Sequence, residues 1–310
     1  MSALYSDRPD TEEHGAETSP RTPPPLGFEQ VLELTDAGDG ALRGRPHAGR
    51  PPRAFGGVTL AQALRAGGLD VGPDRQLHSL HAYFLRAVNP EREVTYRVRA
   101  LRDGSSYAAR QVDARQGTEV LHLTASFKRP ETTPGRQARM PGAPGPDECE
   151  DPYALWAEEH PESHAAAVIP RVVSLRTVPA DEQERTAVST GLARRRTWLR
   201  AAHPMSDDPL LHAAALAYLS DLTLSPTAAL PWEPLGSRRS RPSGVMLASL
   251  DHAMWFHRPC RADAWLLYAQ HSTAISDGRV LSRGEIWSAE GDLVATVQQE
   301  ALIRIRPAQR

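Results

Sequence analysis

The sequence predicts an α+β protein in which two copies of one unit are fused, each a buried helix packed on an antiparallel sheet. Two observations support this prediction. A small-residue helix followed by strand-like runs occurs in the first half of the chain and recurs in the second. Turn and strand residues also recur, at an offset of about 170 residues. The matching pairs are Asp103 with Asp277, Arg110 with Arg283, and Gly117 with Gly291. A repeat this long indicates a duplicated domain, because solenoid repeats are about 20–50 residues long.

The helix of the first copy is expected from Phe55 to Ala66, where glycines precede small and apolar residues (FGGVTLAQALRA). Small side chains let a curved sheet wrap closely around a helix, which gives a layer of helix on sheet. Four strand-like runs follow the helix. They begin at His78 (HSLHAYFLR), Glu93 (EVTYRVRALR), Ser106 (SYAARQVDA) and Glu119 (EVLHLTASF). The pair Asp103-Gly104 between two of the runs predicts a hairpin.

The second copy repeats this order. Its helix is expected from Pro209 to Leu222 (PLLHAAALAYLSDL). Four strand-like runs follow, and Asp277-Gly278 between two of them is a second hairpin signal. The runs begin at Gly244 (GVMLASLDHAMWFHR), Ala264 (AWLLYAQHSTA), Arg279 (RVLSRGEIW) and Leu293 (LVATVQQEALIRI).

Three polar or proline-rich stretches divide the chain. Residues 1–25 contain too few apolar groups to fold and are expected to form a disordered tail. Residues 129–152 are rich in Pro and Gly and are expected to link two domains, at 26–128 and 153–310. The run Leu235–Pro242 (LGSRRSRP) is expected to be an exposed loop in the second domain.

Composition argues against several classes of protein. The formal net charge is −2 over 310 residues, so no general attraction to nucleic acid or membranes is expected. Cys149 and Cys260 are far apart in the sequence and suggest neither a disulfide framework nor a zinc site, so no metal or cofactor is expected. No signal peptide is expected, because the N-terminus has no apolar core after a basic start, and no apolar run approaches the roughly 20 residues that span a bilayer. A soluble protein of the cytoplasm is therefore expected.

Eight segments resemble the acyl-CoA thioesterase II family, in the family's order and over nearly the whole chain from Phe28 to Arg304. Those in the first half are AFGGVTLAQAL (from Ala54), HSLHAYFLR (His78), LRDGSSYAARQV (Leu101) and TASFKRPE (Thr124). Those in the second half are LAYLSDLTLSPTAALP (Leu216), SLDHAMWFHRP (Ser249), WLLYAQHSTAISDGRVLSRGEIW (Trp265) and DLVATVQQEALIR (Asp292). The resemblance implies a double hotdog fold, in which each domain wraps an antiparallel sheet around a central helix. It also implies hydrolysis of acyl-CoA in fatty acid metabolism. Hotdog sheets tend to pair edge to edge, so a homo-oligomer is expected.

The resemblance also implies the site residues. The family's catalytic carboxylate lies in a helix motif S-D-L, which places it at Asp221 here. The family's hydroxyl residue, often threonine, precedes a D-H-x-M-W-F-H strand and corresponds to Ser249. The family's glutamine lies in the last strand just before a glutamate, at Gln299. One departure from the family is Val58, where a glutamine is usual.

These residue types suit thioester hydrolysis. A thioester needs a positioned water, a base for the water's proton and donors for the oxyanion. Asp221 can be the base if burial raises its pKa, and Ser249 and Gln299 can orient the water by hydrogen bonds. Backbone N–H groups at a helix start are a candidate oxyanion hole. Arg258 and Arg283 could contact CoA phosphates, with a solvated or ion-paired role as the alternative.

Three other readings compete. A serine hydrolase would need a G-x-S-x-G elbow, which the sequence lacks. Hotdog hydratases use an Asp and a His five residues apart, a spacing that Asp207 and His212 share, although the glycine and asparagine of the hydratase motif are missing. A non-catalytic acyl-CoA or acyl-carrier binding protein is the third reading. The retained hydrogen-bonding types at the three site positions favour the thioesterase.

Overall fold

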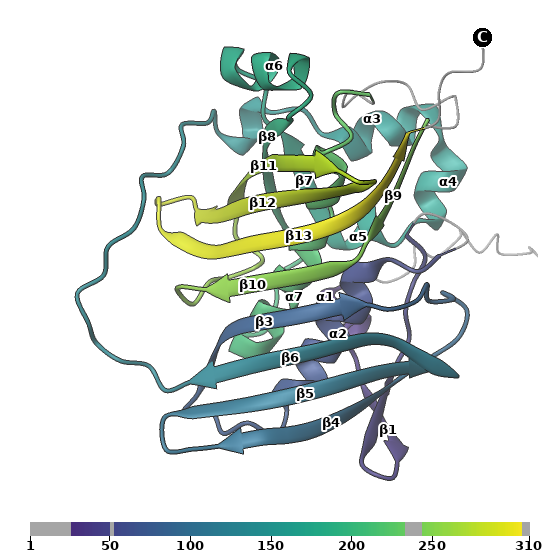
Figure 1. Cartoon of the computed structure of the whole chain (residues 1–310), viewed down its shortest axis with the longest axis vertical. Helices are drawn as coiled ribbons and strands as arrows, with labels where there is room; N and C mark the ends of the chain where they lie inside the picture. Colours follow the sequence, from purple (N-terminus) through teal and green to yellow (C-terminus); the bar gives the residue numbers. More distant parts are fainter. Residues whose placement is uncertain (1–25, 50–52, 233–243, 306–310) are drawn as a thin grey trace, which may run out of the picture.

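The computed structural model describes residues 26–49, 53–232 and 244–305 (Figure 1). The predicted tail at 1–25 and the predicted loop Leu235–Pro242 lie outside the described residues. In the described part of the chain, thirteen strands form one sheet, and every strand pair in it is antiparallel. Two long helices lie on one face of this sheet, behind it in Figure 1. The expected α+β class and the layers of helix on sheet are therefore confirmed.

The first half contains the predicted helix and four strands, preceded by a short helix and two short strands that the sequence did not reveal. In chain order its elements are α1 Phe28–Val31, β1 Thr35–Gly38, β2 Ala41–Gly44, α2 Gly56–Gly68, β3 Gln76–Phe84, β4 Val94–Asp103, β5 Tyr107–Gln116 and β6 Thr118–Lys128.

The second half repeats this plan with more helical insertions. The elements before its central helix are η1 Pro146–Glu148, α3 Pro152–Glu159, α4 Pro161–Ala166, α5 Ile169–Val172, β7 Val173–Thr177, α6 Glu182–Ser189 and β8 Arg194–Ala201. The central helix and the elements after it are α7 Pro209–Asp221, α8 Leu224–Thr227, β9 Val245–Ser249, β10 Asp251–Phe256, β11 Leu266–Ser276, β12 Arg279–Ser288 and β13 Leu293–Ile305.

The two halves share a single sheet. Its strand order is β1-β2-β4-β5-β6-β3-β10-β13-β12-β11-β8-β7, with β9 also paired to β13. The junction is the antiparallel pair β3 and β10, which runs from Asp251 opposite Tyr83 to Trp255 opposite Ser79. The edge-to-edge pairing expected of hotdog sheets thus occurs inside this one chain.

The two central helices pack against each other beneath the sheet. Asp208 caps α7 by accepting a hydrogen bond from the Leu210 N–H, and Pro209 occupies the first helical position, where its missing N–H costs nothing. A Cβ on Gly57 of α2 would lie 2.9 Å from the Tyr218 carbonyl oxygen of α7. Gly57, the second residue of α2, therefore allows the two backbones to approach closely where the start of α2 packs on α7.

The two predicted hairpins form, but only one uses a two-residue turn. Asp277 and Gly278 both have positive φ, at 49° and 67°, as a type I′ turn requires. After Asp103, three residues separate β4 from β5, and neither Asp103 nor Gly104 has a positive φ.

The predicted equivalence of Arg110 and Arg283 is wrong. Arg110 is 3% exposed on the inner face and forms ion pairs with Asp70 and Asp103. Arg283 is exposed on the outer face of β12. Side chains alternate between the faces of a strand, so a shift of one residue reverses the direction of the side chain.

Residues between β6 and η1 contain no helix or strand and pass outside the sheet in Figure 1. The later part of this segment is attached to the second half. The Gln137 side chain donates to the Gly291 carbonyl at 2.7 Å and accepts from the Leu293 N–H at 3.0 Å. The Trp198 indole donates to the Pro144 carbonyl at 2.8 Å. None of the described helices is both long enough and apolar enough to span a bilayer.

Candidate active site

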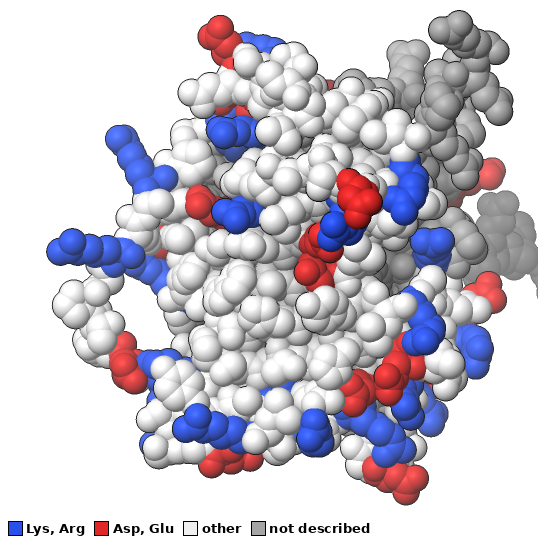
Figure 2. Space-filling view, in the orientation of Figure 1, with Lys and Arg blue, Asp and Glu red and all other residues white. Residues whose placement is uncertain are grey.

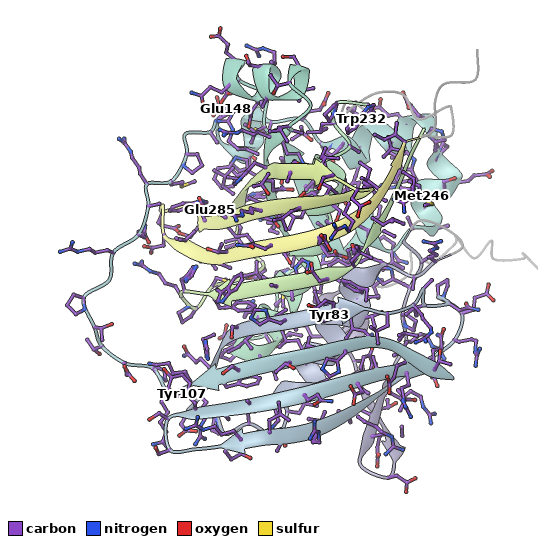
Figure 3. The ribbon with its side chains drawn as sticks, in the orientation of Figure 1. Tyr83, Tyr107, Glu148, Trp232, Met246 and Glu285 are labelled. Atoms are coloured by element: carbon purple, nitrogen blue, oxygen red, sulfur yellow. The ribbon has the colours of Figure 1, made fainter. Side chains whose placement is uncertain are left out.

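The three residues expected to form the site lie together in the second half. Asp221 is the last residue of α7 and is 8% exposed. The Gln299 Nε2 atom donates to Asp221 Oδ1 at 2.6 Å and to Ser249 Oγ at 3.1 Å. Gln299 is 1% exposed, so these contacts form in the interior. By contrast, Tyr83 and Glu285 stand on the outer face of the sheet, towards the viewer in Figure 3.

An irregularity in the sheet brings Ser249 to this point. The sequence predicted one continuous strand from Gly244, but the structure divides it at Leu250 into β9 and β10. Both pieces pair with β13, Ser249 opposite Ala301 and Ala253 opposite Gln298, so one extra residue lies between them. Such a bulge redirects the side chains around it. It places Ser249 towards Gln299 and also turns His252, three residues later, into the interior, where it is 0% exposed.

The first half completes the site from the other side. The Gly57 N–H, in the first turn of α2, donates to the Asp221 carboxylate. A Cβ on Gly56 would lie 3.0 Å from Asp221 Oδ2 and 3.1 Å from the Phe84 ring. The sequence marked both glycines only as the opening of a helix. Their contact with Asp221 could not be found from sequence, because it joins residues more than 160 positions apart.

Burial raises the pKa of Asp221 to about 6, while the hydrogen bonds from Gln299 and the Gly57 N–H oppose this rise. A carboxyl with this pKa is mostly ionised at neutral pH and can still accept a proton readily. That is the property required of a general base.

His252 lies beneath Asp221 but is not a second charged group. Its Nε2 is 2.9 Å from Ser220 Oγ, and burial lowers its pKa to about 3, so the imidazole is neutral. Its Nδ1 lies 3.8 Å from Asp221 Oδ1 and has no hydrogen-bond partner in the described part of the protein. A neutral, buried histidine in contact with Ser220 fits a structural role.

The two arginines considered for CoA phosphates do not reach this site. Arg258 follows β10 and is ion-paired with Asp292. Arg283 pairs with Gln298 and projects from the outer face, opposite to Gln299. Figure 2 shows this outer face, on which charged side chains are sparse over the middle of the sheet.

The residues of the hydratase alternative are not brought together as a catalytic pair. The Asp207 side chain is 91% exposed and ion-paired with Arg261. His212 is 4% exposed, and its Nδ1 accepts a hydrogen bond from the Ala262 N–H at 3.1 Å.

Among the described residues, no group of three or more His, Cys, Asp or Glu side chains could hold a metal ion. Cys149 and Cys260 are both free thiols.

Comparisons with known proteins agree with the sequence and the fold. Residues 46–128 match the family model of the acyl-CoA thioesterase N-terminal domain, and residues 146–303 match that of the C-terminal domain. Acyl-coenzyme A thioesterase 8 of Rattus norvegicus is 34% identical over 293 residues, covering 89% of this chain and 88% of the relative. Acyl-CoA thioesterase 2 of Haemophilus influenzae is 34% identical over 291 residues, covering 88% and 96%.

Solved structures show the same similarity. An acyl-CoA thioesterase II from Mycobacterium marinum has a TM-score of 0.72 and 36% identity, covering 91% of this chain and 99% of that one. A protein with a hotdog fold from Alicyclobacillus acidocaldarius has a TM-score of 0.69 at 21% identity, covering 90% and 98%, which supports the fold alone. Because the matches extend over both halves and most of the length of each relative, this chain belongs to the acyl-CoA thioesterase family and has a double hotdog fold.

Proposed function

We propose that this protein hydrolyses acyl-CoA to a free fatty acid and CoA, with a water activated by Asp221 and oriented by Ser249 and Gln299. The observation that carries the proposal is the buried hydrogen-bonded group of these three side chains beside the first turn of α2. The family membership supports the same activity.

The hydrogen-bond directions suit a bound water. An ionised Asp221 can only accept, so the Gln299 atom facing it must be the amide nitrogen. Ser249 Oγ accepts from the same nitrogen, which leaves its own proton free to donate to a water. That water can donate one proton to Asp221 and keep a lone pair for the thioester carbonyl.

The reaction then needs no covalent enzyme intermediate. The water oxygen bonds to the carbonyl carbon while its proton passes to Asp221. The C–S bond breaks, and Asp221 returns the proton to the CoA sulfur. A general base contributes about 10²–10⁴-fold to such a rate.

The start of α2 supplies donors for the oxyanion. The first N–H groups of a helix have no partner within the helix, and the capping residue Phe55 offers no side-chain hydrogen bond to them. A Cβ on Gly56 would lie 3.0 Å from Asp221 Oδ2, so the glycine lets the helix start lie close to the carboxylate. A thioester carbonyl bound beside this helix start would face both its N–H groups and the activated water.

A panel of acyl-CoAs with different chain lengths tests the proposal. Release of free thiol, slower by about 100-fold or more in Asp221→Asn, is the expected result. A change in enoyl-CoA absorbance without thiol release would identify a hydratase instead. Tight binding of acyl-CoA without either reaction would identify a binding protein.

A further inference from the structure

The site contains a fourth polar side chain, from the short helix α8. Ser225 is 5% exposed, and its Oγ donates to Gln299 Oε1 at 2.6 Å. We propose that Ser225 is a positioning residue, which fixes the Gln299 amide in the one orientation that serves Asp221 and Ser249. This inference rests on the proposed function, because it assigns Ser225 a role in the same reaction.

A glutamine amide has two ends that differ chemically but hardly differ in shape. Rotating the Gln299 amide by 180° would bring its carbonyl oxygen to 2.6 Å from the Asp221 carboxylate, where two acceptors repel each other. It would also leave Ser249 without its donor. Because Gln299 is 1% exposed, bulk solvent cannot readily replace a lost hydrogen bond, so the orientation of the amide matters for the whole site.

Ser225 favours the productive orientation from the far side of the amide. A buried carbonyl oxygen needs a donor, and the Ser225 hydroxyl supplies one at short distance. In the rotated orientation the Ser225 hydroxyl would have to turn and accept from the NH₂ group, while the carbonyl oxygen of the amide would face the Asp221 carboxylate, which can only accept. The hydrogen bonds therefore run in one direction, from Ser225 to Gln299 and from Gln299 to Asp221 and Ser249.

The backbone of α8 holds Ser225 in place. The Ala228 N–H donates to the Ser225 carbonyl at 3.1 Å, and the Thr227 N–H donates to the Thr223 carbonyl at 3.1 Å. Thr227 lies two residues later in α8 and makes a similar contact. Its Oγ1 donates to the side-chain oxygen Oε1 of Gln270 at 2.9 Å. Gln270 donates to Thr197, not to Asp221 or Ser249. Thr227 therefore provides a matched control, a buried α8 hydroxyl bound to a glutamine outside the site.

The pKa of Asp221 depends on the orientation of the Gln299 side-chain amide, because the other groups around the carboxylate are neutral. Gln299 of β13 and the Gly57 N–H of α2 donate to it, and the neutral His252 of β10 faces it. Tyr218 of α7 and Tyr268 of β11 also lie near Asp221. Burial and the charge of Asp221 both raise the pKa of each phenol well above its ordinary value, so both phenols are neutral. Loss of the Gln299 donor would therefore raise the pKa of Asp221.

The test compares Ser225→Ala, Ser225→Thr and Thr227→Val with the full-length wild type, after melting temperatures have shown that each variant folds. In Ser225→Ala we expect kcat to fall about 10-fold with little change in KM, as befits a lost buried hydrogen bond. The acid limb of the kcat profile should move to higher pH, because the base must be ionised and its pKa has risen. Ser225→Thr keeps the hydroxyl, so its kcat and the acid limb of its pH profile should match those of wild type. Thr227→Val should also leave kcat and the acid limb unchanged.

A second measurement works without turnover. In protein with ¹³C-labelled aspartate, the Asp221 carboxyl signal can be assigned by its loss in Asp221→Asn and titrated in each variant. An upward shift of the Asp221 pKa in Ser225→Ala, and in no other variant, supports the positioning role. This result would stand even if no acyl-CoA were hydrolysed; in that case the proposed function alone would fail. An unchanged pKa and kcat in Ser225→Ala, or equal shifts in Thr227→Val, would overturn the assignment of Ser225.

Discussion

At the scale of single residues, the raised pKa of Asp221 makes the fold less stable at neutral pH, where the proposed mechanism needs an ionised carboxylate. Its pKa in the folded protein is about 6, above its ordinary value of 3.8, so the folded state binds more protons between these values. Its contribution to stability therefore falls as pH rises through this range. Under the proposed mechanism, activity is expected to rise over the same range, because the base must be ionised. The burial that suits Asp221 to this proposed role thus opposes folding.

Asp221→Asn should accordingly gain stability relative to wild type at pH 7, by on the order of 3 kcal/mol, and less at pH 4. Urea unfolding of both proteins at the two pH values measures this difference. Asp263→Asn is a control of opposite sign, because the Arg261 guanidinium lowers the pKa of Asp263 to about 2 and its carboxylate stabilises the fold at pH 7. A wild type that matches Asp221→Asn at both pH values would mean that Asp221 has an ordinary pKa.

The same substitution should lower kcat by about 100-fold or more, because the amide cannot take the water's proton. The substitution keeps the shape of the side chain, so KM should change little. Steady-state thiol release measures both constants. An Asp221→Asn enzyme with a rate near that of wild type would exclude Asp221 as the base.

Ser249 should tolerate threonine, because the chemistry requires only a hydroxyl and a β-branched residue suits a strand. Ser249→Ala removes one hydrogen bond to the water, and a loss of about 0.5–1.5 kcal/mol corresponds to roughly 2- to 13-fold in kcat. The expected order of kcat is wild type similar to Ser249→Thr, then Ser249→Ala, then Asp221→Asn. Equal damage in Ser249→Ala and Asp221→Asn would point to a covalent serine nucleophile, which an acyl-enzyme seen by mass spectrometry would establish.

At the scale of elements, the start of α2 packs closely on α7 and, under the proposed mechanism, also takes part in the chemistry. Alanine normally stabilises a helix relative to glycine, by about 1 kcal/mol. In Gly57→Ala the new Cβ would clash with the Phe55 ring and lie 2.9 Å from the Tyr218 carbonyl oxygen, so we expect destabilisation of about 1–3 kcal/mol. We also expect a lower kcat, since the Gly57 N–H contacts Asp221.

Gly67→Ala is the matched control at the other end of α2, where the new Cβ would lie 2.9 Å from the Val112 side chain. It should alter stability and leave kcat near wild type. Urea unfolding and thiol release on both variants separate packing from chemistry. If both substitutions lowered kcat equally, the start of α2 would have no special role in the site.

The sequence predicted elements with strong periodicity or turn signals and missed those without. The helices α2 and α7 and the strands after them lie within a few residues of their predicted bounds. Strands β1 and β2 are only four residues long, which is too short for alternation to be recognised. The bulge at Leu250 could not be foreseen, because an extra residue shows itself only against the partner strand β13.

At the scale of the whole molecule, the site depends on contacts between the halves. The resemblance to the thioesterase family implied that Asp221, Ser249 and Gln299 form one site, and the sequence placed all three in the second repeat. It could not show that α2 of the first half meets Asp221, or that β3 and β10 make one sheet. The expected homo-oligomer remains a prediction, which light scattering would test.

The last prediction concerns the segment between the halves. Arg136 is exposed in the stretch without helix or strand, whereas the strands of both halves are paired in the sheet. Limited trypsin treatment should therefore cut first before Gly27 and within residues 129–152. Because the β3–β10 pairing and the packing of α2 on α7 hold the halves together, a chain cut after Arg136 should elute as one particle and keep its thioesterase activity.

Mass spectrometry locates the cuts, and size-exclusion chromatography followed by thiol release tests the cut protein. Arg136→Gln with Arg139→Gln removes these two cleavage sites and should leave the central segment intact under the same treatment. Primary cuts inside the strands at Glu93–Phe127 would contradict the predicted organisation. Separation of the halves after cleavage would instead show that the segment tethers them and that the sheet junction is weak. Since the junction buries backbone hydrogen bonds and the helices beneath it bury nearly all their side chains, we expect the halves to stay together.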